Sequence, residues 1–314
     1  MNKIAFIFPG QGSQATGMGL DLYNNFASAK NVYEIANEVL NKKISDICFN
    51  GPDEDLKLTI NAQSAIVATS IAALEAFREL CPEIKPDVTM GHSLGEYCAM
   101  YCANVMDLKT TMQAIQKRSE LMDEATKITK GTMAAILGAD IEVIKESLNE
   151  VSNLGVAQVA NYNDPTQVVI TGEVEAINKA CELIKEKGAK RVVPLAVSGG
   201  FHSKLMDSAT NGFVDFVKEL NLNDATIPVI TNVDSKETLK AGDFANKMSS
   251  QINSSVLWVQ TIKKAIEMGV DTFVEFGNGK VLAGLNRKIS ASITTYNVYD
   301  SESLKATIQG LKGV

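Results

Sequence analysis

The stretch Val88-Thr89-Met90-Gly91-His92-Ser93-Leu94-Gly95-Glu96 decides the fold, because it contains the pattern G-x-S-x-G between Gly91 and Gly95. The residues before it form a short apolar run typical of a buried strand, and those after it are typical of a helix. Glycine is needed on both sides, since a Cβ there would collide with the backbone of so sharp a turn. The pattern therefore predicts a strained nucleophile, Ser93, with Oγ exposed above the sheet. The N–H of Leu94 points at the same space and is a candidate oxyanion donor.

The overall composition is that of a soluble, packed protein, with 45% hydrophobic and 21% charged residues in a chain of 314. This length indicates one large domain with an insert, or two domains. The net charge of −7 makes nucleic acid a poor partner for the chain as a whole. No run reaches transmembrane length, and the apolar N-terminus is too short for a signal peptide, so we expect no membrane partner.

The five cysteines predict neither a disulfide framework nor a metal site, because their number is odd and no C-x-x-C occurs. They fit a reducing cytoplasm, which is the expected location. Cys98 and Cys102 are expected to be small apolar residues on the inner face of the helix that follows Ser93. We expect no metal and no cofactor.

Strands and helices alternate through most of the chain. A first strand, Lys3–Phe8, leads into a glycine-rich loop that lacks G-K-[ST]; it is better suited to lend an amide to an oxyanion hole than to bind a nucleotide. The other elements expected in residues 1–127 and 198–314 are helices near 22–40, 59–80, 94–103, 108–125, 203–220 and 258–268, a helix after Gly277–Lys280, and strands near 227–232, 272–276 and 294–298. This alternation predicts a mostly parallel sheet with helices on both faces.

Residues 128–197 show a different order of predicted strands and helices and are expected to form a small inserted subdomain. Its elements are predicted in the order β-α-β-β-α-β, which is that of a ferredoxin-like unit. The predicted ranges are Thr132–Gly138, Ile141–Val151, Val156–Tyr162, Gln167–Gly172, Val174–Gly188 and Lys190–Val197.

A nucleophilic serine needs a base, and the chain contains two histidines. His92 is adjacent to Ser93, so its side chain is expected to point elsewhere and to orient the turn or pack beneath it. His202 follows a glycine-rich turn and precedes a helix, where a loop residue can reach the serine. No acidic third member is evident, and a backbone or amide carbonyl could orient the imidazole instead.

Arg118 stands out because it lies in an apolar stripe. Leu108, Met112, Ile115 and Met122 recur at helical spacing, and Arg118 falls on the same face. A cation on such a face is unfavourable unless it meets an anion. Either Arg118 extends to solvent or pairs with a carboxylate of the protein, or the anion arrives with the substrate.

Taken together, these blocks resemble malonyl-CoA:acyl carrier protein transacylases of bacterial fatty acid synthesis, nearly from end to end. The matching blocks are Phe8–Gln14, Gly91–Glu96, Arg118, Asn161–Pro165 with Gln167–Ile170, Phe201–Ser203, Val274–Gly277 and Gly279–Leu282.

The resemblance implies a hydrolase-like α/β core and a role for each site residue. Ser93 would carry the malonyl group, and His202 would act as general base and acid. Arg118 would bind the malonyl carboxylate, and Gln251 would offer its carbonyl to His202. The remaining implied positions are the oxyanion-hole amides of Gln11 and Leu94, and Gln63 and Asn163 as residues lining the site.

Two departures from the family pattern concern the loops around the site. Gly200 stands where the family often has proline, which predicts a more mobile loop at His202. Ser254-Ser255 precede Trp258 where the family often has Asn-Pro, which puts the local backbone after Gln251 in doubt.

The resemblance implies transfer of a malonyl group from malonyl-CoA to the phosphopantetheine thiol of acyl carrier protein, by a monomer. A polyketide-pathway malonyl transferase, a serine thioesterase or esterase, and a non-catalytic carrier-binding module are the alternatives. Arg118 argues against an esterase, which has no use for a buried cation, and Ser93 with His202 argues against the binding module. Basic pairs that could attract an acidic carrier are Lys190 with Arg191 and Arg287 with Lys288, although solvated surface charge explains them equally well.

Overall fold

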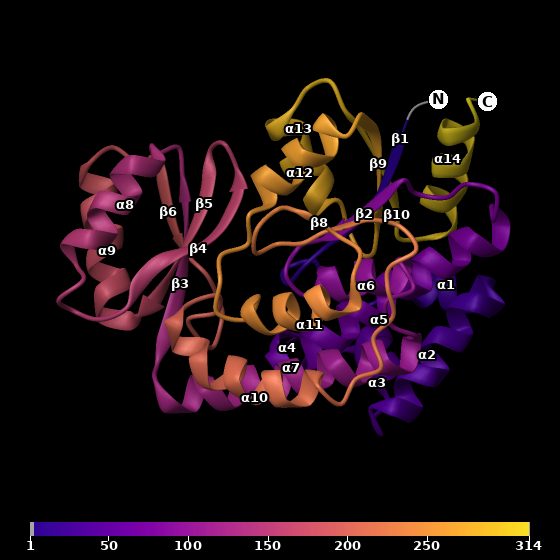
Figure 1. Cartoon of the computed structure of the whole chain (residues 1–314), viewed down its shortest axis with the longest axis horizontal. Helices are drawn as coiled ribbons and strands as arrows, with labels where there is room; N and C mark the ends of the chain where they lie inside the picture. Colours follow the sequence, from indigo (N-terminus) through magenta and orange to yellow (C-terminus); the bar gives the residue numbers. More distant parts are fainter. Residues whose placement is uncertain (1–2, 314) are drawn as a thin grey trace.

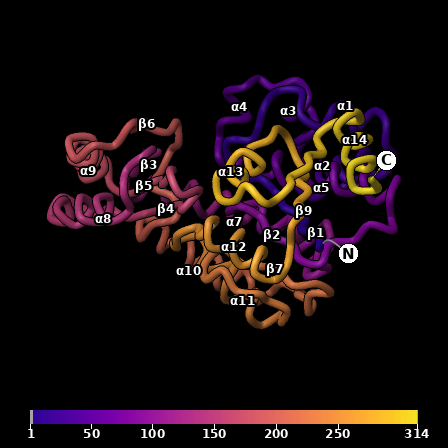
Figure 2. The backbone as a smooth tube through the Cα atoms, turned by 90° about the horizontal axis from the view of Figure 1, so that it is seen from above, coloured from indigo at the N-terminus to yellow at the C-terminus, as the bar shows by residue number. Residues whose placement is uncertain are grey.

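A computed structural model describes residues 3–313, which form a large α/β unit with a smaller one standing to its side (Figures 1 and 2). Its elements are β1 Lys3–Phe8, α1 Leu20–Asn25, α2 Ala27–Val39, α3 Ile44–Asn50, α4 Asp53–Lys57, α5 Thr59–Leu80, β2 Val88–Gly91, α6 Gly95–Cys102, α7 Leu108–Ile128, β3 Gly131–Leu137, α8 Ile141–Glu150, β4 Ala157–Asp164, β5 Gln167–Glu173, α9 Val174–Glu186, β6 Arg191–Pro194, a 3₁₀ turn Lys204–Met206, α10 Asp207–Val217, β7 Val229–Ile230, β8 Glu237–Thr238, α11 Ala241–Ser250, α12 Trp258–Glu267, β9 Val270–Phe276, α13 Val281–Ile289, β10 Thr294–Val298 and α14 Ser301–Lys312.

The large unit is built on a six-stranded sheet in the order β10-β9-β1-β2-β7-β8. All neighbouring strands are parallel except the β7–β8 pair at one edge. Phe8 at the end of β1 pairs in register with Gly91 at the end of β2, so the glycine-rich loop and the G-x-S-x-G turn leave the sheet side by side. This mostly parallel sheet confirms the predicted fold class.

Alternate residues of β1 enter two different cores, as expected for a strand buried on both faces. Phe6 and Phe8 belong to a core with the helices α2, α5 and α6. Ala5 and Ile7 belong to a second core, which α12 and α13 cover.

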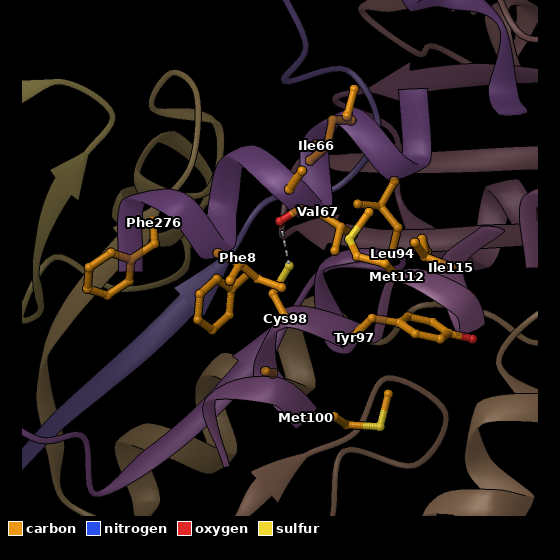
Figure 3. Close-up of a cluster of buried hydrophobic side chains, with 14 of the residues drawn as sticks. Phe8, Ile66, Val67, Leu94, Tyr97, Cys98, Met100, Met112, Ile115 and Phe276 are labelled. Carbon is orange, nitrogen blue, oxygen red and sulfur yellow. Dashed lines mark hydrogen bonds between the residues drawn. The ribbon is translucent and has the colours of Figure 1, made fainter. Parts of the chain in front are cut away.

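Helix α5 supports the turn that carries Ser93. Figure 3 shows Ile66 and Val67 of α5 beside Leu94 and Cys98 at the start of α6. The Cys98 thiol donates to the Val67 carbonyl at 3.9 Å. By length and composition α5 could cross a membrane, but 89% of its most apolar segment is buried inside the molecule, as in the core helix of a compact protein.

The smaller unit contains a four-stranded antiparallel sheet in the order β4-β5-β3-β6, with α8 and α9 packed on it. This is the strand order and direction of a ferredoxin-like fold, as the order of elements in the sequence predicts. Its strands run from Gly131 to Pro194, inside the predicted insert of residues 128–197. The exact domain boundaries stay a prediction.

Several elements differ from those expected. The single helix predicted near residues 22–40 is two helices, because Phe26 is extended, with φ −129° and ψ 125°. The predicted last strand of the insert, Lys190–Val197, is shorter, and β7 covers only two residues of the strand predicted at 227–232. The elements that sequence reasoning missed are α3, α4, β8, α11 and α14.

Candidate active site

The turn between β2 and α6 holds Ser93 in a left-handed conformation, with φ 53°. A Cβ on Gly91 would lie 2.0 Å from the Gly95 carbonyl carbon, and a Cβ on Gly95 would lie 2.2 Å from the Phe8 carbonyl oxygen. Only glycine fits at these two positions, as the sharp turn predicted from the sequence requires. The left-handed conformation of Ser93 is unfavourable by about 1–3 kcal/mol for a non-glycine residue, so contacts with surrounding residues must hold Ser93 in it.

Ser93 and His202 meet at this turn. Ser93 Oγ lies 2.7 Å from His202 Nε2. On the other side of the ring, Nδ1 lies 2.9 Å from the Gln251 backbone carbonyl and 3.1 Å from that of Ser254. Two carbonyl acceptors require the hydrogen on Nδ1, so Nε2 is left to accept the Ser93 hydroxyl. Burial, reinforced by the nearby Arg118 charge, lowers the pKa of His202 to about 3, so the ring is neutral at physiological pH.

The loop that carries His202 is held by the smaller unit. His202 also has a positive φ, 57°. The Thr171 hydroxyl on β5 donates to the Phe201 carbonyl at 2.9 Å. A Cβ on Gly131 would lie 2.4 Å from the Gly200 nitrogen, so strand β3 and this loop can approach closely because Gly131 has no side chain.

Arg118 reaches Ser93 from helix α7. Its side chain is 1% exposed. One terminal nitrogen donates to Gln63 Oε1, and the other lies 3.1 Å from both Ser93 Oγ and Gln251 Oε1. Its guanidinium also lies 5.7 Å from the ring centre of Tyr97.

No acidic side chain within residues 3–313 makes a salt bridge with Arg118. The acidic groups that act on Arg118 are Tyr97 and, after it, Glu96, both on the helix that follows Ser93. Burial raises the pKa of Glu96 to about 8, so this carboxyl is mostly neutral at pH 7. Burial also lowers the pKa of Arg118, but a guanidinium keeps its proton in proteins. Of the two interpretations of Arg118, an internal ion pair is therefore not what the structure contains.

His92 lines the same pocket as Ser93 and His202, but its side chain bonds to Asn163 rather than to either of them, as expected for its neighbouring position on the turn. Its Nε2 lies 2.8 Å from Asn163 Oδ1, and its ring packs 5.6 Å from that of Trp258. Burial lowers its pKa as well.

Gln63 and Asn163 each contact a residue that lines the pocket. Gln63 is fully buried and contacts Arg118, while Asn163 contacts His92. Neither is among the residues that line the pocket. That both residues line the substrate site stays a prediction.

The Gln11 and Leu94 backbone N–H groups belong to the loop after β1 and to the residue that precedes α6, respectively. Within residues 3–313 neither N–H has a hydrogen-bond acceptor. Two such donors near a serine suit the stabilisation of a developing oxyanion.

A pocket of about 390 Å³ opens between the two units, above Ser93. Its lining combines apolar side chains with the polar groups of Ser93, Arg118 and His202. The lining residues are Gln11, Gly12, Gln14, Lys57, His92, Ser93, Arg118, Met122, Met133, Asn161, Leu195, Ala196, Val197, Phe201 and His202.

Sequence reasoning missed Asn232 and Ser254. Asn232 contacts both Gly91 and Ser93, and Ser254 is the second acceptor for His202. Both act through contacts with residues far away in the chain, and neither belongs to a recognisable local pattern.

The fold agrees with what known proteins show. The family model of the acyl transferase domain matches residues 5–294, which defines the class as acyltransferase. The malonyl CoA-acyl carrier protein transacylase of Bacillus subtilis is 44% identical over 313 residues, covering 99% of this chain and 98% of that protein. The chain thus belongs to the family of malonyl CoA-acyl carrier protein transacylases.

Solved structures show the same relationship. The acyl-carrier-protein-S-malonyltransferase of Bartonella henselae has a TM-score of 0.95 and 37% identity, covering 99% of this chain and 100% of that one. A malonyl-transacylase in complex with its type II polyketide synthase acyl-carrier protein has a TM-score of 0.95 and 35% identity, with the same coverage.

Proposed function

We propose that this chain transfers the malonyl group of malonyl-CoA to the phosphopantetheine thiol of an acyl carrier protein, through a malonyl ester on Ser93. The observation that carries the proposal is Arg118, a buried cation without an internal anion, 3.1 Å from Ser93 Oγ. Acyl transfer needs a nucleophile and a base, and the malonyl group adds the need for a cation. The three groups meet at one pocket.

In the first half-reaction, Ser93 Oγ bonds to the thioester carbonyl carbon while His202 Nε2 takes the hydroxyl proton. Negative charge develops on the carbonyl oxygen, and the N–H groups of Gln11 and Leu94 are suited to stabilise it. The C–S bond then breaks, and the departing coenzyme A sulfur takes the proton from Nε2. His202 is neutral in the free enzyme, so it is ready to accept the first proton.

The second half-reaction is the reverse, with a new thiol. The phosphopantetheine thiol gives its proton to His202 Nε2 and attacks the malonyl ester carbonyl. The tetrahedral intermediate collapses, the bond to Ser93 Oγ breaks, and Oγ takes the proton back. One serine and one imidazole therefore serve both acyl donor and acceptor, as in other covalent two-step transfers.

Arg118 is proposed to select the malonyl group. Its guanidinium can hold a carboxylate through two parallel charge-assisted hydrogen bonds. One terminal nitrogen of Arg118 contacts Ser93 Oγ. Binding of the malonyl carboxylate would draw that nitrogen away and leave Oγ with His202 alone.

The carrier is proposed to approach near Lys190 and Arg191. Both side chains are exposed, and strand β6, which starts at Arg191, leads directly into the pocket-lining residues 195–197. The other basic pair is less available, because Lys288 lies 3.0 Å from the buried carboxylate of Asp164. A basic site at the start of the strand that leads to the pocket would attract an acidic carrier.

The experiment that tests the proposal is intact-mass spectrometry after mixing with malonyl-CoA. We expect a malonyl adduct that persists until a carrier with a free phosphopantetheine thiol is added, and no adduct on Ser93→Ala. Rapid release of free malonate without a carrier would instead identify a thioesterase. An adduct that survives on Ser93→Ala would remove Ser93 from the mechanism.

The carrier's pathway is a separate question. We propose fatty acid elongation, and the structural similarity to a transacylase of a polyketide carrier supports a polyketide carrier as a second candidate. Comparing kcat/KM for a fatty acid carrier and a polyketide carrier distinguishes the two.

We further propose a monomer in the cytoplasm. All five cysteines are free thiols, which suits a reducing compartment, and Ser93, His202 and Arg118 meet within one chain. Light scattering after size-exclusion chromatography tests the oligomeric state.

A further inference from the structure

The strained turn at Ser93 is held by one side chain from elsewhere in the chain, Asn232. The Ser93 N–H donates to Asn232 Oδ1 at 2.7 Å. The Asn232 Nδ2 group donates to the Gly91 carbonyl, also at 2.7 Å. A single amide thus binds the turn on both sides of His92, and it uses both its acceptor and its donor to do so.

Asn232 is itself fixed in place. Its side chain is fully buried. Its backbone N–H donates to Glu96 Oε2, and its carbonyl accepts from the Leu257 N–H at 3.1 Å. Glu96 lies on α6, directly after the turn, so Asn232 contacts the Gly91–Glu96 segment at Gly91, Ser93 and Glu96.

The chemistry of this position favours an amide. Aspartate would still accept from the Ser93 N–H, but it would leave the Gly91 carbonyl without a donor and bring a carboxylate into a fully buried place. Alanine would remove both hydrogen bonds. Buried polar groups without partners are unfavourable, so the turn would rearrange to find other partners.

To hold Asn232 in place, Glu96 needs only one oxygen that accepts the Asn232 backbone N–H. Oε1 has no hydrogen-bond partner, while Oε2 accepts from Asn232. Burial raises the pKa of Glu96 to about 8, consistent with a carboxylic acid that is mostly neutral at pH 7. Glutamine offers the same acceptor at nearly the same shape, and alanine offers none.

We propose that Asn232, held in place by Glu96, is a positioning residue that keeps Ser93 in the left-handed conformation in which Oγ meets His202. Asn232 touches no reacting atom, so it acts through Ser93. The inference rests on the proposed function only in taking Ser93 as the nucleophile. It adds a group from the loop after strand β7, the strand that pairs with β2, to the residues that build the site.

The test compares Asn232→Ala and Asn232→Asp with the wild type. Displacement of a reacting group by about 1 Å lowers rates by on the order of 10²-fold. We therefore expect kcat for malonyl transfer to fall about 10²-fold in Asn232→Ala, with the KM for malonyl-CoA nearly unchanged. Asn232→Asp is expected to be intermediate, because one of its two hydrogen bonds remains.

Two further comparisons separate positioning from general loss of stability. Asn61→Ala is the matched control, since Asn61 is also buried and also donates to a backbone carbonyl, that of Asp55 at 2.9 Å. It is expected to lower the melting temperature and leave kcat unchanged. Glu96→Gln is expected to retain activity, because glutamine keeps the acceptor oxygen, and Glu96→Ala is expected to lose activity. If Glu96 acted only through its charge, both variants would lose activity.

Labelling of Ser93 by an organophosphonate fluoride probe, with Ser93→Ala as the blank, reports the reactivity of the serine without any malonyl group. Slower labelling of Asn232→Ala supports positioning. Wild-type labelling and wild-type kcat in a folded Asn232→Ala or Asn232→Asp would overturn it. If the wild type is labelled but transfers no malonyl group, the proposed function fails while the positioning role can still be measured.

Discussion

Replacing Arg118 by alanine is the most informative perturbation of substrate choice. Arg118 is 1% exposed, and its hydrogen-bond partners are Gln63, Gln251 and Ser93, none of which carries a negative charge. If the malonyl carboxylate supplies the missing anion, Arg118→Ala leaves that carboxylate desolvated and alone, which costs roughly 3–5 kcal/mol. At about 1.4 kcal/mol per tenfold, kcat/KM for malonyl transfer falls by on the order of 10² to 10³ or more.

Acetyl transfer is expected to respond in the opposite direction. Acetyl-CoA has no carboxylate, so in the wild type Arg118 keeps its contacts with Gln63, Gln251 and the Ser93 oxygen. Arg118→Ala removes the unmatched cation and frees Ser93 Oγ, so acetyl transfer is retained or increased. Arg118→Lys is expected to be intermediate, because an ammonium keeps the charge but cannot form two parallel hydrogen bonds.

The assay is kcat/KM for both thioesters with a common carrier, alongside a thermal melt. Lys117→Ala is the matched control, because it removes one cation from the adjacent position of the same helix, where the side chain is only partly buried. It is expected to leave both rates unchanged. An unchanged malonyl-to-acetyl ratio in Arg118→Ala, or equal loss of both activities with a lowered melting temperature, would refute the assignment of Arg118 to the substrate carboxylate.

Three other predictions concern the base, the pH dependence and the carrier. His202→Ala should lower kcat/KM about as much as Ser93→Ala, because such groups act as a unit; His92→Ala should have a smaller effect, and the reverse order would exchange their roles. Burial lowers the pKa of His202 to about 3 from 6.5, so between these values the unfolded chain binds a proton that the native chain does not, and native stability falls with falling pH. Urea unfolding should therefore show that His202→Ala loses about 1.4 kcal/mol less per pH unit in that window, and equal pH dependence would contradict a neutral His202. Charge reversal at Lys190 and Arg191 should raise the KM for the carrier several-fold and leave formation of the malonyl adduct unchanged, whereas an unaltered KM rejects this surface.

The parts of the site predicted from the sequence are those with a local physical signature. The turn at Ser93 requires glycine on both sides for steric reasons, and the collision distances at Gly91 and Gly95 show why. Arg118 was recognised because a cation interrupts an apolar stripe. Strand β10, Thr294–Val298, was predicted with its observed bounds because it is an isolated run of strand-forming residues between turn signals.

The parts that escaped prediction depend on contacts between distant residues. Asn232 is an ordinary asparagine after a strand, and its importance lies in hydrogen bonds to Gly91 and Ser93. Helix α11 was missed because it contains glycine and a pair of serines and buries only Phe244, Met248 and Ser249. Tertiary packing, rather than propensity, stabilises a helix of this kind.

The acceptors that orient His202 have a consequence for how the enzyme tolerates mutation. In a triad with an acidic third member, one substitution deletes the orienting group. Here both acceptors are main-chain carbonyls, those of Gln251 and Ser254, and every amino acid carries one. Substitutions at these two positions leave the imidazole its partners as long as the backbone path is kept, so variation of side chains can proceed there without loss of the base. An insertion or deletion between the two positions would move the carbonyls and so would deprive His202 of its partners.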